Sequence, residues 1–175
     1  RPHKVAKIEY KIAETWDVTP KGPGHHVYMM CGTSLEEDHA LINGQGVFGY
    51  FHGLQGSPIS IKLEYPEDWK VGTALKGSKG SYSAKNYDHI VDSPILLGRL
   101  TKASKQIAGA EVEIYAYSKT DKIHAKDLLD NMSGMLDAAG KFLKKLPVNR
   151  YTFLYHFEDQ GAGAWEHSYS SEYVL

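Results

Sequence analysis

Cysteine is nearly absent from this chain of 175 residues, which contains only Cys31. A single cysteine excludes an internal disulfide framework, so cysteine usage does not assign the protein to a compartment. No apolar run approaches the roughly 20 residues of a membrane-spanning helix. The net charge of -1 gives no electrostatic reason to expect binding to nucleic acid. These absences leave a globular protein whose localisation the sequence does not determine.

Motifs for catalysis are also missing from the chain. The zinc-binding sequence His-Glu-x-x-His occurs nowhere in it. The serines at 168, 170 and 171 lack the glycine framing of a nucleophile elbow, and the apolar surroundings of Cys31 are typical of an inert buried thiol. Glycines at 44, 46 and 49 have the bare spacing of a dinucleotide-binding loop but no strand–helix context. We therefore assign no catalytic residue and no metal ligand within this chain.

What is present is an ordinary hydrophobic share of 42%, which excludes a wholly disordered chain. Apolar and polar residues alternate in several short segments, which predicts half-buried strands. A stretch interrupted by glycines predicts further short strands with tight turns, and a segment rich in lysine, serine and glycine predicts an exposed loop. The strands are predicted at 8–12, 59–65, 112–116 and 151–157, the glycine-rich stretch is 44–56, and the exposed loop is 76–83.

Residues 128–146 carry apolar side chains at steps of three and four, which predicts one long amphipathic helix with a single apolar stripe. Either Thr120 or Asp121 is expected to cap its start. Gly134 and Gly140 each lower helix stability by roughly 1 kcal/mol relative to alanine, and they leave room for close packing.

The fold class we expect is α+β, with an incomplete β-sandwich-like part followed by a strand–helix–strand unit. The sequence Ser-Pro at 93–94 favours extended backbone, and a buried apolar run follows it. We place a domain boundary near this point, which divides the chain into residues 1–98 and 99–175. Since pieces of about 80 residues bury a reduced fraction of their surface, the two parts are expected to pack on each other or on another chain.

Five separated segments carry a resemblance to a known family. They are 38–44 (DHALING), 69–75 (WKVGTAL), 87–94 (YDHIVDSP), 146–151 (LPVNRY) and 163–168 (GAWEHS). As an ordered set they resemble the glycyl aminopeptidase family of gluzincin zinc metallopeptidases. The resemblance implies that residues 1–98 are part of an amino-terminal β domain and that 99–175 begin a thermolysin-like catalytic domain. It also implies an interior piece that is cut before the zinc ligands, so that zinc belongs to the parent protein and not to this chain.

The segment Gly163-Ala164-Trp165-Glu166-His167 is similar to the Gly-Ala-Met-Glu-Asn motif of related aminopeptidases, from which it departs at Trp165 and His167. In those relatives the motif forms an edge strand that faces the zinc helix. A small Gly-Ala pair lets a peptide backbone pair with an exposed strand edge. A carboxylate beside that edge can hold a free α-ammonium group, a contact of roughly 1.5–3 kcal/mol. All five residues are therefore predicted to bind substrate, and the alternative is that Glu166 is a surface carboxylate.

The histidines allow several further interpretations. His25 and His26 are adjacent, so they would point to opposite faces of a strand and make a poor metal pair. The polar cluster at 36–39 (EEDH) is interpreted as a solvated turn in preference to a cation site. His156 lies opposite the aromatic face of its strand and is expected to be exposed or to face a cleft. His167 either supports Glu166 and the substrate groove, or is a partly buried, hydrogen-bonded histidine.

The function we expect is that of a substrate-binding part of a zinc aminopeptidase, which removes glycine or other small amino-terminal residues from peptides. This piece alone is expected neither to hydrolyse peptides nor to bind the catalytic zinc. Its expected partners are peptides, and copies of the chain that pair through cut sheet edges. The alternatives are a non-catalytic β-rich binding or scaffold module, and a peptidase-like protein that has lost its metal. A His-Glu-x-x-His sequence downstream in the same reading frame would favour the enzyme.

Overall fold

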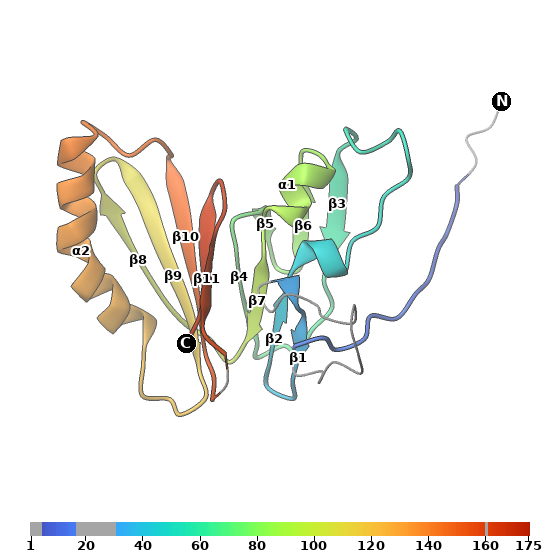
Figure 1. Ribbon diagram of the computed structural model, residues 1–175, viewed down its shortest axis with the longest axis horizontal. Helices are drawn as coiled ribbons and strands as arrows, with labels where there is room; N and C mark the ends of the chain where they lie inside the picture. Colours follow the sequence, from blue (N-terminus) through green and yellow to red (C-terminus); the bar gives the residue numbers. More distant parts are fainter. Residues whose placement is uncertain (1–4, 17–30, 160) are drawn as a thin grey trace.

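The computed structural model describes residues 5–16, 31–159 and 161–175, so the interpretation of His25 and His26 lies outside the described residues. Its strands form three open sheets in two units that lie side by side, with a five-stranded sheet on the left of Figure 1 and two smaller sheets on the right. The fold is mostly β, with two α-helices in the described part of the chain. Neither of these helices has the length and apolar character that crossing a bilayer requires.

The amino-terminal unit consists of a four-stranded antiparallel sheet in the order β1-β2-β7-β4 and a three-stranded antiparallel sheet in the order β3-β6-β5. A short helix, α1, leads from the smaller sheet back into the larger one. The elements are β1 (Ser34–Leu35), β2 (His39–Ile42), the 3-10 helix η2 (Gly44–Gly46), β3 (Ile59–Lys62), β4 (Lys70–Thr73), β5 (Lys76–Ser78), β6 (Ser81–Ala84), α1 (Tyr87–Val91) and β7 (Ile95–Gly98).

Strand β7 shows why this unit has a core on both faces of its larger sheet. Ile95 and Leu97 pack into a cluster with side chains of the three-stranded sheet, such as Ile61. Leu96 points the other way, into a cluster that includes residues of the second unit. A strand buried on both faces has a continuous apolar sequence, so the buried run predicted here is confirmed.

The carboxy-terminal unit is one five-stranded sheet in the order β11-β12-β10-β9-β8. Strands β9, β10 and β12 are parallel, while β8 and β11 run antiparallel to their neighbours at the two edges. Helix α2 connects β9 to the parallel strand β10, which confirms the predicted strand–helix–strand unit. The elements are β8 (Thr101–Ile107), β9 (Ala110–Ser118), α2 (Ala125–Phe142), β10 (Arg150–Phe157), β11 (Gly163–Glu166) and β12 (Ser170–Val174).

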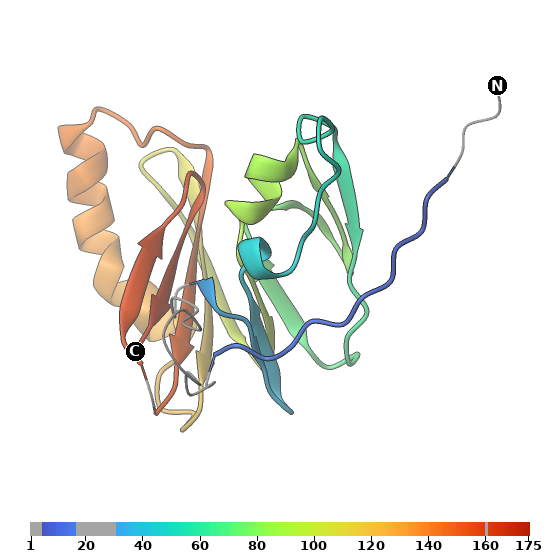
Figure 2. The ribbon, with the colours of Figure 1, turned by 45° about the vertical axis from the view of Figure 1, so that its right-hand side comes forward.

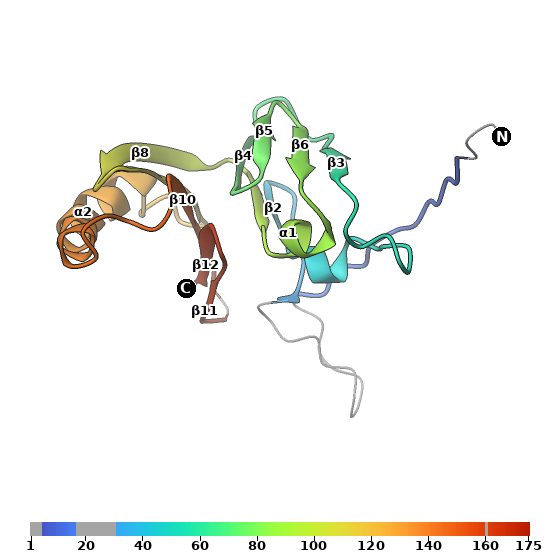
Figure 3. The ribbon, with the colours of Figure 1, turned by 90° about the horizontal axis from the view of Figure 1, so that it is seen from above.

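The five-stranded sheet lies between α2 on one side and the amino-terminal unit on the other (Figures 1 and 3). The face toward α2 packs Ile114 and Phe153 against Leu129 of the helix. The opposite face packs Leu154 against Leu41 of β2. The two parts of the chain therefore share an apolar core, as expected from their small size.

Two predicted strand regions are wrong. Residues 8–12 form no strand, and Figure 2 shows the segment 5–16 as an extended trace along the outside of the amino-terminal unit. Their apolar side chains remain exposed, with Ile8 at 65% and Tyr10 at 60%. The glycine-rich stretch 44–56 forms η2 and turns instead of short strands. In both places the local sequence pattern is typical of strands, but no strand in the described part of the chain pairs with the backbone.

The predicted loop at 76–83 is a β-hairpin, which corrects the sequence interpretation. Ser78 pairs with Ser81, so Lys79 and Gly80 alone form the turn between β5 and β6. Both have positive φ angles, 49° and 79°, as a two-residue type I′ turn requires. The sequence Lys-Gly is a weaker signal for such a turn than Asn-Gly, and the strands on either side carry polar residues, so the hairpin was missed.

Helix α2 is confirmed, but its start and its stripe need correction. It begins at Ala125 and is not capped by Thr120 or Asp121. The Ala125 N–H is instead bound by the hydroxyl of Thr101 on β8 at 2.9 Å, a partner too distant in sequence to be recognised as a cap. The predicted stripe is wider than the buried face, because three of its apolar side chains are more than half exposed. These are Met135, Phe142 and Leu143.

The two glycines of α2 have different surroundings, which gives opposite predictions for alanine. A Cβ at Gly134 meets nothing within 4 Å, whereas a Cβ at Gly140 falls 2.1 Å from the Cβ of Ala108 in the β8–β9 turn. We expect Gly134→Ala to raise the free energy of unfolding by about 1 kcal/mol through helix propensity. Gly140→Ala is expected to lower it, because overpacking costs about 1–3 kcal/mol. Urea unfolding of both variants tests this, and shifts of the same sign would contradict it.

Candidate functional site

Strand β11 forms one edge of the five-stranded sheet. It pairs only with β12 among the described strands, with Gly163 opposite Val174 and Glu166 opposite Ser171. Its second backbone edge therefore has no strand partner in the described part of the chain. An open edge of this kind can add an extended peptide through main-chain hydrogen bonds. The predicted edge strand is confirmed, while the binding of substrate by its residues stays a prediction.

The side chains of β11 alternate between two faces of the sheet. Trp165 is half-buried and packs against the apolar core that the two units share. Ala164 and Glu166 are exposed on the other face. The face is identified by Ser171, which lies opposite Glu166 and forms a hydrogen bond with the hydroxyl of Tyr151 at 2.6 Å. Since Tyr151 packs against the α2 cluster, Glu166 lies on the face of the sheet that carries the helix.

The Glu166 carboxylate forms no hydrogen bond or ion pair with any described residue. It is therefore free to bind a cationic group that approaches the open edge of β11. The neighbouring Ala164 presents only a methyl group on the same face, which allows another backbone to come close. The exposed side chain of Glu166 fits both the substrate-binding carboxylate that the resemblance implied and the alternative of a surface carboxylate, so its role stays a prediction.

His167 follows β11 and is buried, with 9% of its surface exposed. Its Nδ1 lies 3.1 Å from the carboxylate of Asp92, which also accepts the Ser168 N–H at 3.2 Å. Burial lowers the pKa of His167 although Asp92 raises it, so the ring is neutral near pH 7. The ring also lies 5.1 Å from that of Trp165. This is the buried, hydrogen-bonded alternative for His167, and the contact with Asp92 fixes the end of β11 to the amino-terminal unit.

Two other histidines differ from the sequence interpretation. His156 is 1% exposed, so it is neither at the surface nor in an open cleft. In the predicted solvated turn, Glu36 and Glu37 are exposed but His39 is 2% exposed. Both rings are covered where the two units meet, and no local pattern in the sequence marks that contact. His52 is exposed, as an isolated surface histidine would be.

Glu172 is a buried acid that the sequence analysis did not identify. It lies in the middle of β12 with no exposed surface, and its nearest polar partner is the Asn43 amide at 3.3 Å. Burial raises its pKa to about 7, and the hydrogen bond from Asn43 lowers it only in part. The sequence Ser-Ser-Glu-Tyr-Val places this glutamate directly after two serines, and this local pattern does not show which face of the strand is buried.

The fold is similar to part of a known peptidase structure. It matches an aminopeptidase N family protein from Idiomarina loihiensis with a TM-score of 0.70 and 22% sequence identity. The match covers 81% of this chain and 26% of that one, so the chain spans about a quarter of the length of the protein it resembles. At this identity the likeness establishes the fold alone.

The family is established by the sequence itself. The profile of the Peptidase M61 N-terminal domain matches residues 1–99, more than half of the 175 residues, and the chain belongs to this family. No protein with curated annotation matches the chain. The β-rich amino-terminal unit is consistent with the N-terminal domain of this peptidase family. These comparisons do not identify a substrate or a metal.

Proposed function

We propose that this chain binds the free amino terminus of a peptide in a zinc-dependent aminopeptidase of the glycyl aminopeptidase type. The observation that carries the proposal is the position of Glu166, a carboxylate that pairs with no described residue and lies beside an edge of β11 that no described strand covers. Peptides with glycine or another small first residue are the proposed substrates. In this proposal residues 1–98 belong to the amino-terminal β domain, and residues 99–175 belong to the thermolysin-like catalytic domain.

Binding would use the backbone of Gly163, Ala164 and Trp165 together with the side chain of Glu166. An extended peptide pairs with the edge of β11, and this pairing sets its direction and depth. The Glu166 carboxylate then accepts hydrogen bonds from the α-ammonium group, worth about 1.5–3 kcal/mol. A blocked amino terminus cannot make this contact, so the enzyme would prefer a free one. Trp165 contributes by anchoring the strand in the core, since its ring faces away from Glu166.

Zinc fits this proposal only as a group held by residues outside β11. The strand and its flank offer one free carboxylate, Glu166, while the ring of His167 is turned to Asp92. A single carboxylate is too few ligands to hold a zinc ion. When bound by the peptidase, zinc would polarise the scissile carbonyl and activate water. The part played by this chain is to orient the peptide and hold its amino terminus.

Exposed apolar surface on α2 supports a larger domain around this unit. Met135, Phe142 and Leu143 are 57%, 87% and 53% exposed. The helix packs mainly against β8 and β9, at the opposite end of the sheet from β11. In the proposal, further helices of a catalytic domain cover these side chains. They also cover the part of the same sheet face that lies beside Glu166. Large apolar side chains exposed to this degree are consistent with a surface that another segment covers.

Replacing Glu166 by glutamine in the whole peptidase tests the proposal. We expect kcat/KM for a glycyl peptide with a free amino terminus to fall about tenfold to a hundredfold, since each 1.4 kcal/mol is a factor of ten. Hydrolysis of the same peptide with an acetylated amino terminus should be unchanged. Asp137→Asn, on an exposed face of α2, is the matched control. Equal losses on both peptides, or no loss, would refute the role of Glu166.

A further inference from the structure

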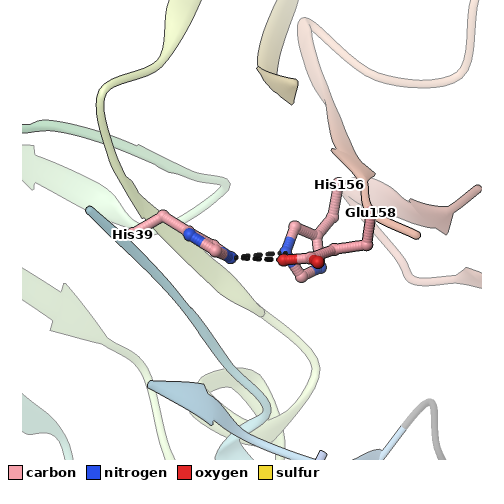
Figure 4. A group of neighbouring side chains, drawn as sticks. All are labelled: His39, His156 and Glu158. Atoms are coloured by element: carbon pink, nitrogen blue, oxygen red, sulfur yellow. Dashed lines mark hydrogen bonds and ion pairs between the residues drawn. The ribbon is translucent and has the colours of Figure 1, made fainter. Parts of the chain in front are cut away.

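Three metal-ligand side chains converge where the two units meet. His39 is the first residue of β2, His156 lies in β10, and Glu158 follows the end of β10. Figure 4 shows the two rings and the carboxylate pointing toward one another. The Nε2 atoms of the two histidines are 2.8 Å apart, and the Glu158 Oε1 lies 2.9 Å from the Nε2 of His39 and 3.2 Å from that of His156.

The two Nε2 atoms and the Glu158 Oε1 bring more lone pairs than protons into the space between them. The Nδ1 of His39 donates to the Asp38 carboxylate at 2.8 Å, so its Nε2 is an acceptor unless a second proton makes the ring an imidazolium. That Nε2 faces the Glu158 oxygen, which is also an acceptor. A single proton on His156 cannot satisfy all three sides of the triangle. One cation bound to all three atoms satisfies each of them.

The surroundings of His156 hold its ring in place beside His39 and Glu158. Its Nδ1 is buried and has no partner among the described residues, so the tautomer is decided by what binds Nε2. The ring has 1% of its surface exposed, which limits its freedom to turn away from the site.

The surrounding residues support His39 as a ligand. The carboxylate of Asp38, which binds the far nitrogen of the ring, is itself paired with Arg99. The ring of Tyr117 stacks on His39 with centroids 3.7 Å apart. A carboxylate on the second nitrogen of a histidine, held by its own partner, is the usual way in which proteins orient an imidazole toward a metal.

The site can be reached from solvent on the side of Glu158. A hollow of about 600 Å³ is lined by residues that include His39 and Glu158. The Lys119 ammonium lies 3.7 Å from the other oxygen of Glu158, Oε2, so it does not occupy the side that faces the histidines. A water molecule from this hollow could complete a coordination sphere.

We propose that His39, His156 and Glu158 form a zinc-binding site that joins the two units of this chain. Two imidazoles and one carboxylate, with a water as fourth ligand, make a donor set that zinc accepts. Imidazole ligands argue against calcium and magnesium, which prefer oxygen. Tetrahedral ligands of zinc lie roughly 3.3 Å apart, so the three atoms need to separate by only a few tenths of an ångström. The ion would tie β2 to β10 across the shared core.

Zinc titration of the chelator-treated chain tests the proposal. We expect isothermal titration to show one zinc ion bound per chain and the melting temperature to rise with added zinc. Cobalt in place of zinc should give visible absorption bands of a four-coordinate nitrogen and oxygen site. His39→Ala should abolish binding, and Glu158→Gln, a change of nearly the same shape at a partly exposed residue, should weaken it roughly 100-fold or more.

His52→Ala is the matched control, because this histidine is exposed and is not part of the cluster of His39, His156 and Glu158. Its affinity for zinc should equal that of the unaltered chain. Circular dichroism of each variant without metal shows whether it folds. If His39→Ala does not fold, Glu158→Gln is the decisive variant. The proposal would be overturned if the unaltered chain did not bind zinc, or if Glu158→Gln bound zinc as tightly as the unaltered chain. The contacts among His39, His156 and Glu158 would then be hydrogen bonds that a proton makes.

Discussion

Replacing Arg150 by methionine is expected to lower the free energy of unfolding of this chain by about 3 kcal/mol. Arg150 opens β10, and its Nε donates to the Glu113 carboxylate at 2.6 Å. The same guanidinium donates to the carbonyl of Thr73 at 3.0 Å, so it links the two units. The Glu113 side chain is only 6% exposed, and without arginine it keeps one cationic partner, Lys102, at 2.8 Å.

The size of this effect follows from what the substitution leaves behind. Removing one partner of a buried ion pair costs about 3–5 kcal/mol, because a buried charge loses its compensation. We expect the lower end of that range since Lys102 remains and Arg150 is partly exposed. Burial by itself would raise the pKa of Glu113, but hydrogen bonds from Lys102 and Arg150 lower it overall. The stabilisation by this pair is therefore lost as the pH falls below the usual range of a carboxyl group.

Urea unfolding of a double-mutant cycle provides the measurement. Glu113→Gln combined with Arg150→Met should destabilise the chain by less than the sum of the single changes, because no unpaired charge then remains buried. Lys126→Met is the control: this lysine pairs with Asp130 at the surface, with its side chain 75% exposed, and its loss should have little effect on the free energy of unfolding. Additive effects in the cycle would show that Arg150 and Glu113 do not stabilise each other.

Glu172→Gln is expected to stabilise the chain by up to about 3 kcal/mol near pH 8, while near pH 4.5 the effect is small. The folded chain holds the Glu172 pKa at about 7, against an ordinary value of 4.5. Between these values the unfolded chain has lost the proton and the folded chain has kept it. Since the folded state then binds more protons, stability falls as the pH rises through this window and levels off above it. Glutamine cannot ionise, so the variant avoids this loss.

Urea unfolding at about pH 5 and about pH 8 compares the two proteins under the same conditions. Other groups also titrate in this range, so the test is the difference between the unaltered chain and Glu172→Gln, which cancels them. Parallel profiles for Glu172→Gln and the unaltered chain would mean that Glu172 ionises normally in the folded state.

The elements that the sequence predicted are those whose side chains repeat with a simple period. The α2 stripe, the alternation in β9 and the aromatic face of β10 each contain their own signal within about a dozen residues. The segment from Gly163 to Glu166 could be placed on an edge strand because the resemblance supplied the context. The alternation at 8–12 shows the limit, since an equally regular pattern there found no strand to pair with.

Residues whose role depends on the contact between the two units could not be predicted. His39 follows three acidic residues, which is typical of a solvated turn, yet it is covered by Tyr117 from the other unit. Glu172 lies in a strand whose inner face is decided by β2 and Asn43. The start of α2 depended on Thr101, a residue of another strand. In each case the deciding partner is distant in sequence.

The sequence by itself determined the type of the long helix and of the central strands of the second unit, and the peptidase family to which the chain belongs. Only the tertiary structure brought together His39 and His156, which are 117 residues apart, and Asn43 and Glu172, which are 129 residues apart. The physical reason is that periodicity records which side of an element is apolar, whereas the neighbour of a buried polar group is fixed by how two sheets pack over a shared core.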